Sequence, residues 1–371
     1  MLNSSYYKNI GLDKIYNKVI NNERLTKEDG ITLYKCNDLF AIGALAMLVR
    51  TNLHNDRTFY VVNRQINYTN VCVNDCKFCA FRRDHESDNG AFHLSKEEIL
   101  DKIIKANNSL NLDEIHIVGG CHPDLKLSWF EDLLSTIHNN LPHIPIKAFT
   151  PVEIAHFATL NNISTIEVLK RFKNVGLSML PGGGAEIFDQ NLRKNLCPKK
   201  ADAKTWLNIS QEAHSLGIKS NSTMLFGHIE TIEQRIDHLI QLREQQDKSH
   251  GFTCFIPLPF LTKNSKLQLL DDKCPEERGI DQLKTIAISR LMLDNIPHIK
   301  AYWIMLGAKL AQTALHFGAD DIDGTIVEEH IGHMAGAISS QGLTIKELIT
   351  MIQESGFTPI RRNATFEEQE I

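Results

Sequence analysis

The sequence predicts an α/β protein, a (β/α)8 barrel of the TIM type with a helical cap at its N-terminal end. Apolar runs of strand length alternate with helical patterns between residues 59 and 326. This alternation is typical of parallel strands joined by helical crossovers. Eight such units close a barrel, whose active face lies at the carboxyl ends of the strands. Glycines and polar residues gather at those ends, so we expect the chemistry there.

The predicted strands cover residues 59–67, 114–118, 144–149, 175–180, 218–226, 252–257, 299–305 and 320–326. Ser95 and Glu98 form a capping box that opens a helix after the first strand. A second helix is predicted near residues 231–246, where apolar residues form one stripe. Residues 1–55 read as a helical extension packed on the barrel, 56–340 as the barrel, and 341–371 as a C-terminal helix with a polar tail. We expect that tail to be loose after Arg361.

Composition favours a cytoplasmic enzyme that acts on small molecules. The chain has 371 residues, of which 42% are apolar, enough for a large core. No apolar stretch approaches the roughly 20 residues of a membrane span, and the start lacks the order of a signal peptide. A net charge of −5 gives no electrostatic footprint for nucleic acid. Five of the eight cysteines have no framework spacing, which excludes a disulfide scaffold: they are Cys36, Cys121, Cys197, Cys254 and Cys274.

The other three cysteines, Cys72, Cys76 and Cys79, have the spacing C-x3-C-x2-C directly after the first predicted strand. Three thiolates can hold an iron–sulfur cluster by three corners and leave one iron open, whereas four close it. A structural Cys3His zinc site with His85 or His93 is the alternative. Such a module is expected as a small separate unit, and this triplet stands at the entry of a large domain. The spacing therefore favours iron–sulfur.

Further candidates stand at the ends of the other predicted strands. Gly119 and Gly120 allow the backbone to approach a ligand closely, although a plain tight turn explains them too. The run Gly182-Gly183-Gly184 either cradles a ligand with its N–H groups or only turns the chain toward Glu186. Arg193 can pair bidentately with a carboxylate or lie on a solvated helix face. Polar side chains at the same edge complete the set: Asn67, His122, Lys147, Thr150, Ser222 and His228.

The cysteine spacing, with an aromatic residue before Cys79, resembles the radical S-adenosylmethionine superfamily. Other stretches resemble one family within it, the aminodeoxyfutalosine synthases of the futalosine route to menaquinone: residues 63–72, 119–123, 146–150, 180–188, 223–231 and 298–303. One departure is Pro151, where that family is expected to carry a small residue. The nearest confusable relatives are the cyclic dehypoxanthinylfutalosine synthase and the two-part deazaflavin synthase.

The resemblance implies the barrel of the radical S-adenosylmethionine enzymes and assigns roles to the candidates. Cys72, Cys76 and Cys79 would ligate a [4Fe-4S] cluster. S-adenosylmethionine would contact Gly119, Gly120, Glu186, Arg193 and Ser222. The second substrate would contact Asn67, His122, Lys147, Thr150 and His228.

The resemblance also implies a reaction. A reduced cluster, supplied by a low-potential donor such as flavodoxin or ferredoxin, would release a 5′-deoxyadenosyl radical from S-adenosylmethionine. That radical would add to 3-[(1-carboxyvinyl)oxy]benzoate and give 6-amino-6-deoxyfutalosine, methionine and bicarbonate. The alternatives are the cyclic dehypoxanthinylfutalosine synthase, which abstracts hydrogen, and an iron–sulfur or zinc-binding protein without catalysis.

Overall fold

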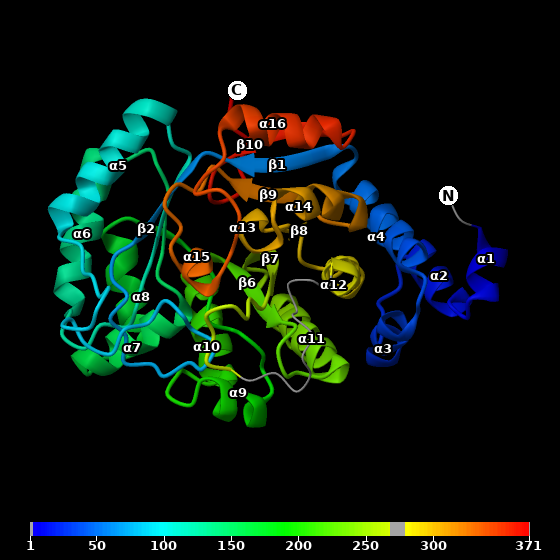
Figure 1. Cartoon of the computed structure of the whole chain (residues 1–371), viewed down its shortest axis with the longest axis horizontal. Helices are drawn as coiled ribbons and strands as arrows, with labels where there is room; N and C mark the ends of the chain where they lie inside the picture. The colour runs from blue at the N-terminus through cyan, green and yellow to red at the C-terminus, as the bar shows by residue number, and fades with distance from the viewer. Residues whose placement is uncertain (1–2, 268–278, 371) are drawn as a thin grey trace.

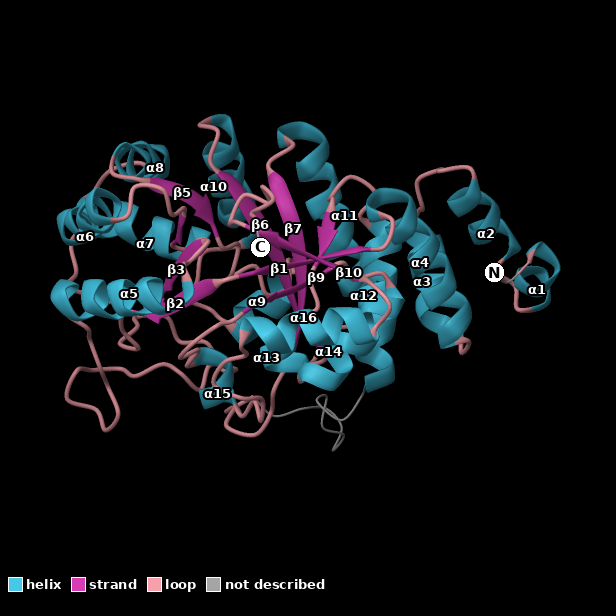
Figure 2. Cartoon of the chain, turned by 90° about the horizontal axis from the view of Figure 1, so that it is seen from above, coloured by secondary structure: helices cyan, strands magenta, loops and turns pink. Residues whose placement is uncertain are grey.

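The computed structural model of the chain describes residues 3–267 and 279–370. Its central sheet consists of parallel strands that follow one another in sequence order from β2 to β8. This sheet forms the wall of the barrel, and helices surround it on the outside (Figures 1 and 2). The strands are β2 (Asn63–Asn67), β3 (Glu114–Val118), β4 (Ile146–Ala148), β5 (Leu177–Leu180), β6 (Lys219–Phe226), β7 (Phe252–Pro259) and β8 (His298–Ile299).

The helices between these strands bury apolar residues against the outside of the sheet. Several begin at a capping box, among them α5, which starts after Ser95 as predicted. The crossover helices are α5 (Lys96–Leu110), α6 (Leu127–Asn140), α7 (Pro151–Asn161), α8 (Thr165–Asn174), α9 (Gln190–Leu196), α10 (Ala203–Ser215), α11 (Ile232–Ser249) and α12 (Gly279–Met292). Cys274 lies outside the described residues.

A second sheet, with the order β10-β1-β9, differs from the predicted eight-stranded wall. It contains β1 (Arg57–Val61), β9 (Asp321–Gly324) and β10 (Thr358–Arg362). The predicted strand 59–67 breaks at Val62, whose N–H donates to the Asp113 carboxylate over 3.0 Å. The chain therefore leaves the second sheet there and enters the barrel as β2. Single bridges, Lys300 to Asp321 and Arg64 to Val327, connect the two sheets.

The predicted strand 299–305 was too long. The pairing of this segment with β7 ends at Ile299, the last residue of β8. The chain then turns into the short helix α13 (Trp303–Leu306). The indole N–H of Trp303 donates to the carbonyl of Gly324 over 2.9 Å and fixes this turn. The remaining short elements follow in order: α14 (Ala308–Ala314), η2 (Leu315–Phe317), α15 (Ile331–Ala335) and α16 (Ile345–Glu354).

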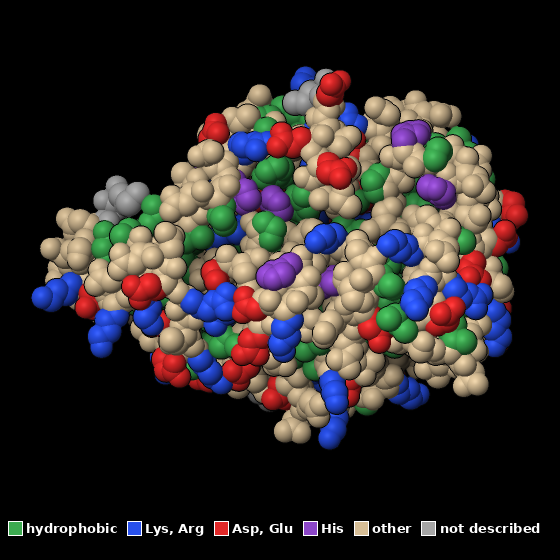
Figure 3. Space-filling model, turned by 180° about the vertical axis from the view of Figure 1, so that it is seen from behind, with side chains coloured by type: hydrophobic (Ala, Val, Ile, Leu, Met, Phe, Trp, Pro, Cys, Tyr) green, Lys and Arg blue, Asp and Glu red, His purple; other side chains and the backbone are tan. Residues whose placement is uncertain are grey.

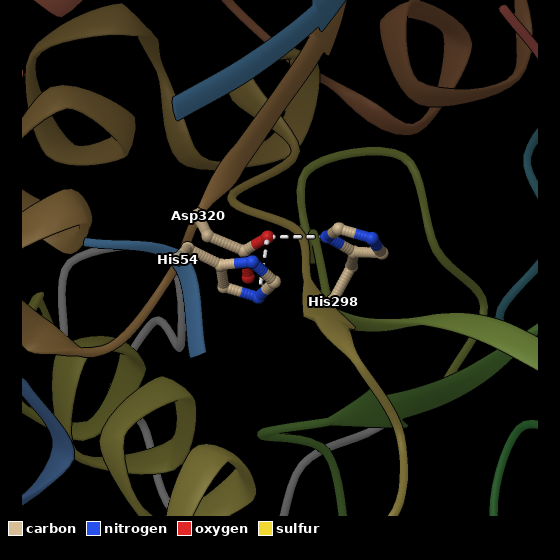
Figure 4. A group of neighbouring side chains, drawn as sticks. All are labelled: His54, His298 and Asp320. Carbon is tan, nitrogen blue, oxygen red and sulfur yellow. Dashed lines mark hydrogen bonds and ion pairs between the residues drawn. The ribbon is translucent and has the colours of Figure 1, made fainter. Parts of the chain in front are cut away.

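Helices fill the N-terminal region and lie to one side of the barrel (Figure 1). They are α1 (Ser4–Asn9), α2 (Asp13–Ile20), α3 (Lys27–Lys35) and α4 (Leu39–His54). Helix α4 packs on α12, and α3 packs on α11 and α12. His54 at the end of α4 lies beside Asp320, which accepts a hydrogen bond from His298 over 2.5 Å (Figure 4). This cluster joins α4 to the barrel. The domain boundaries at residues 55 and 340 stay predictions.

The expectation of a loose tail after Arg361 was wrong. Arg362 is 1% exposed, and its guanidinium donates to the Asp321 carboxylate over 2.5 Å. The Phe366 ring stacks on His298 with the centroids 3.9 Å apart. The start of this segment is therefore held by a buried ion pair, while Glu367, Glu368 and Glu370 further along are exposed.

No helix within residues 3–267 and 279–370 is long and apolar enough to cross a membrane. On the face seen in Figure 3, acidic and basic side chains are interspersed.

Candidate active site

A cavity of about 320 Å³ occupies the barrel and opens at the carboxyl ends of the strands. Ligand pockets commonly measure about 300–1,000 Å³. The three cysteines of the triplet and the Gly119–Gly120 turn line it together, with Lys147, Thr150 and Glu186. The structure thus brings together candidates that lie far apart in the sequence.

The cysteine loop is held in place by main-chain hydrogen bonds. The N–H of Cys72 donates to the carbonyl of Arg83 over 3.1 Å, and the N–H of Lys77 donates to that of Leu196 over 2.9 Å. All three cysteines are half-buried, and all three line the cavity. Three thiols with an open side fit a cluster that leaves one iron free for a small molecule.

The geometry disfavours the zinc alternative. Ligands of one zinc ion lie about 2.3 Å from it, so two of its sulfurs are at most about 4.6 Å apart. In the described residues, two groups of at least three His, Cys, Asp or Glu residues have ligand atoms within 4.8 Å of one another, and neither contains a cysteine. They are His54 with His298 and Asp320, and Glu86 with His93 and His122.

The three thiols have different proton affinities. A hydrogen bond with the Cys121 thiol, together with backbone N–H groups, lowers the pKa of Cys72 to about 6. Burial raises the pKa of Cys76 to about 12, although Lys200 acts against this shift, and burial also raises the pKa of Cys79. Iron binds thiolates, so loading would release protons from Cys76 and Cys79.

The Gly119–Gly120 turn is fixed from beneath by Glu153, on α7. Its carboxylate accepts hydrogen bonds from the Gly119 N–H over 3.1 Å and from the Tyr68 hydroxyl over 2.8 Å. Burial raises the pKa of Glu153 to about 7, against these hydrogen bonds. The Gly120 N–H donates to the carbonyl of Thr69 over 2.8 Å. Because both glycine N–H groups are used and the Gly120 carbonyl lies 3.0 Å from the Tyr68 hydroxyl, the turn would offer the carbonyl of Gly119 to an amino group.

Lys200 is a cavity residue that the sequence reasoning missed. Its ammonium pairs with the Glu186 carboxylate over 2.5 Å, and its side chain is 12% exposed. Glu186 and the thiols of Cys76 and Cys197 raise the pKa of Lys200 well above its ordinary value, against burial, so it stays charged. The only sequence signal was its place shortly after the glycine run, which is too weak to single out one lysine.

Arg193 does not line the cavity, contrary to the expectation of a carboxylate partner. Its guanidinium is buried and donates to the carbonyls of Ala185 and Ala201, and to those of Ile187 over 3.2 Å and Gly184 over 3.5 Å. Arg193 therefore holds the loop that carries Glu186, and the carboxylate pairing is not retained.

Four further candidates are engaged elsewhere. Ser222 alternates with the cavity residues Asn221 and Thr223, so it points out of the barrel, toward the carbonyl of Cys254 at 3.4 Å. His228 packs on its own turn, with Nε2 at 3.0 Å from the Leu225 carbonyl.

Asn67 donates to the Val118 carbonyl over 3.2 Å and joins β2 to β3. His122 is buried beside Glu86, with its Nε2 2.9 Å from that carboxylate. The central cavity is lined by neither of these two side chains.

Two family profiles match the chain. One, described as the Radical SAM superfamily, covers residues 66–242, and the other, described as the CofH/MqnC C-terminal region, covers residues 249–371. Aminodeoxyfutalosine synthase of Thermus thermophilus is 42% identical over 354 residues, 95% of each chain. That of Streptomyces coelicolor is 41% identical over 94% of this chain and 92% of its own.

A third relative carries a different name. The 5-amino-6-(D-ribitylamino)uracil–L-tyrosine 4-hydroxyphenyl transferase of Methanopyrus kandleri is 37% identical over 89% of each chain.

Two solved structures share the fold. Methylornithine synthase (PylB) has a TM-score of 0.73 at 21% identity and covers 93% of this chain and 97% of its own. The FeFe-hydrogenase maturase HydG from Carboxydothermus hydrogenoformans has a TM-score of 0.74 at 17% identity and covers 98% and 82%.

The barrel and the cysteine-lined cavity are those of a radical S-adenosylmethionine enzyme, a class whose profile matches the part of the chain that carries the triplet. Within this superfamily the chain belongs to the family of the aminodeoxyfutalosine synthases, since two of them are 41–42% identical to it over 94–95% of its length.

Proposed function

We propose that this enzyme joins the adenosyl group of S-adenosylmethionine to 3-[(1-carboxyvinyl)oxy]benzoate and forms 6-amino-6-deoxyfutalosine, methionine and bicarbonate. The observation that carries the proposal is the 42% identity to a synthase of that name over 95% of both chains. The match covers the strands that line the cavity as well as the cysteine loop. Menaquinone biosynthesis would then be the process that the enzyme serves.

Cys72, Cys76 and Cys79 would hold a [4Fe-4S] cluster. When bound, such a cluster would supply the one electron that reductive cleavage of S-adenosylmethionine requires.

The side chains of the cavity would bind and orient the two substrates and shield them from water. The Gly119–Gly120 turn, fixed by Glu153, would hold the amino end of S-adenosylmethionine, and Lys200 would provide a cation for its carboxylate. Lys147 and Thr150 would face the second substrate, within a cavity whose walls include Val118, Leu225 and Ile256. Apolar walls exclude water from a reactive intermediate and hold the alkene near the radical carbon.

A second function has an observation in its favour. Relatives named as tyrosine 4-hydroxyphenyl transferases align with 86–94% of the chain at 36–39% identity. Their names describe transfer to a ribitylaminouracil, which would need a different occupant of the same barrel. The cyclic dehypoxanthinylfutalosine synthase remains the other alternative, because one profile carries the CofH/MqnC name.

One competition experiment separates the synthase function from the transferase function. The reconstituted, reduced enzyme is given S-adenosylmethionine together with the enolpyruvyl benzoate, L-tyrosine and 5-amino-6-(D-ribitylamino)uracil, and the products are identified by mass spectrometry. We expect 6-amino-6-deoxyfutalosine. A hydroxybenzyl adduct of the uracil as the main product would contradict the proposal. A parallel sample without the benzoate is the control.

We also propose a cytoplasmic location and a flavodoxin or ferredoxin as electron donor. Turnover with either donor and its reductase, at a rate at least equal to that with dithionite, is the result expected.

A further inference from the structure

A layer of inward-facing polar side chains closes the lower end of the cavity. Gln65, His116 and Lys147 are direct register partners on β2, β3 and β4, so they lie side by side on the inner wall. Lys300 and Asp323 complete the layer where β8 meets β9, and all five line the cavity. Side chains of register partners in a sheet are neighbours, since adjacent strands lie about 4.8 Å apart.

Two donors in this layer have unused hydrogen-bonding capacity. Within the described residues, the buried Nε2 of His116 has no hydrogen-bond partner. Lys147 is 2% exposed, and its ammonium pairs with one carboxylate oxygen, Oε1 of Glu114, at 2.6 Å. An ammonium has three N–H donors, and buried donors are normally satisfied. A ligand in the cavity is the partner that both lack.

The unused donors of Lys147 and His116 favour a ligand with acceptor oxygens. Each ammonium of the layer has a carboxylate partner: Lys147 pairs with Glu114 at 2.6 Å, and Lys300 pairs with Asp323 at 3.0 Å. Within the described residues, Oδ1 of Asp323 is a buried acceptor without a hydrogen-bond partner. Burial and the nearby Lys300 lower the pKa of Lys147, although Glu114 acts against the shift. Burial, helped by Lys147, lowers the pKa of His116 to about 3, so the imidazole is neutral and can present an N–H at Nε2. An incoming carboxylate would accept hydrogen bonds from the ammonium of Lys147 and from the Nε2 N–H of His116.

A carboxylate bound here would belong to the far end of the substrate. His116 stands three residues before Gly119 on β3, a rise of about 10 Å along the strand. The reacting alkene must lie near the mouth, where the cysteines are. The enolpyruvyl carboxylate is attached to the alkene itself and stays with it. The carboxylate on the ring is separated from the alkene by the aromatic ring and the ether oxygen, and therefore reaches the floor.

We propose that His116 and Lys147, with the charge of Lys300 beside them, bind the ring carboxylate of the substrate at the floor of the barrel and point its enol ether toward the cysteines. The chemical class recognised is an arenecarboxylate. This inference rests on the proposed function, whose substrate it orients. It makes His116 a residue that determines specificity.

The test measures binding and does not depend on turnover. The probes are 3-(1-carboxyethoxy)benzoate, a saturated analogue of the substrate, and 2-phenoxypropanoate, which lacks only the ring carboxylate. Titration calorimetry on the reconstituted enzyme gives a Kd for each. We expect the dicarboxylate to bind about 10- to 100-fold more tightly, because a hydrogen-bonded charged group contributes that much. In His116→Phe the ratio of the two constants should fall several-fold, because Lys147 alone remains.

The matched control is His238→Phe. His238 is fully buried and, like His116, has an unpartnered ring nitrogen, but it lies on α11 outside the barrel wall, with Nε2 2.9 Å from the Thr223 carbonyl. Its variant should keep the ratio of the wild type. Because each ratio compares two ligands on one protein, a partly folded variant does not distort it.

The possible results distinguish a failure of the carboxylate site at the floor of the barrel from a failure of the proposed function. A wild-type ratio near one, or an unchanged ratio in His116→Phe, overturns the floor assignment while adduct formation still supports the function. A large ratio that His116→Phe reduces supports the floor assignment. If that ratio is found but the enolpyruvyl benzoate gives no adduct, the proposed function fails, and the site binds another arenecarboxylate.

Discussion

Gly120→Ala tests how closely the Gly119–Gly120 turn must approach the cysteine loop. A Cβ at position 120 would lie 2.3 Å from the carbonyl oxygen of Val71 and 3.1 Å from the Cβ of Cys72. Ordinary contacts begin near 3.4 Å, so the turn or the loop must move by about 1 Å. The first atom met is backbone, directly before a cluster ligand, and cannot rotate away. Overpacking of this kind costs about 1–3 kcal/mol.

The shift should affect turnover more than folding. A misplacement of about 1 Å in a catalytic geometry can lower the rate about 100-fold. We therefore expect kcat/KM for adduct formation to fall by about that factor, with the iron content and visible absorbance measured on the same sample. Gly279→Ala is the matched control, because Gly279 does not line the cavity and its Cβ would meet only side-chain carbons of Leu310 at 3.8 and 3.9 Å. A Gly120→Ala enzyme with the wild-type rate and a full cluster would refute this reasoning.

Three further changes have defined outcomes. Cys76→Ala should abolish the visible absorbance of the cluster and all turnover, whereas Cys197→Ala should keep both; turnover by Cys76→Ala would contradict the ligand assignment. Lys147→Met leaves the buried Glu114 carboxylate without its partner and should lower the free energy of unfolding by about 3–5 kcal/mol in urea titrations. Adding Glu114→Gln should restore part of that loss, and an unchanged single variant would disprove the pairing. Burial lowers the pKa of His214 to about 4, so between pH 6.5 and 4 only the unfolded chain binds a proton there. The free energy of unfolding should therefore decrease by up to about 3 kcal/mol as the pH is lowered across that window. In His214→Gln the free energy of unfolding should depend less on pH than in the wild type.

The strand pattern and the cysteine spacing carried most of what could be predicted. Strand 114–118 was predicted with its exact bounds, because an apolar run between a helix and a glycine pair leaves little freedom. The triplet and the Gly119–Gly120 turn meet in one cavity because both follow neighbouring parallel strands, β2 and β3, whose carboxyl ends share one edge.

The direction of single side chains was less predictable. Ser222 is the middle one of three polar residues on β6, and alternation along the strand turns its neighbours Asn221 and Thr223 toward the cavity instead. Which of the three side chains faces the cavity depends on the register of the strand, and three consecutive polar residues do not indicate that register. The charge of Arg193 suggests a carboxylate partner, yet its buried guanidinium donates hydrogen bonds to carbonyls of its own loop.

The remaining differences between the predicted and the observed elements arise from contacts between residues that lie far apart in the sequence. The break of strand 59–67 at Val62 depends on Asp113, a residue 51 positions away. The tail after Arg361 is ordered by the ion pair of Arg362 with Asp321. Lys200 and His116 gain their importance from neighbours that only the fold supplies, Glu186 in one case and Lys147 in the other.

The fate of the adenosyl group tests the proposed reaction most directly. The reduced enzyme is given the enolpyruvyl benzoate and S-adenosylmethionine with a heavy-isotope label in its adenosyl group, and products are followed by mass spectrometry. We predict that the label appears in an adduct with the benzoate, with methionine and bicarbonate formed in equal amounts. Recovery of all the label as 5′-deoxyadenosine, with no labelled adduct, would contradict the addition and favour hydrogen abstraction.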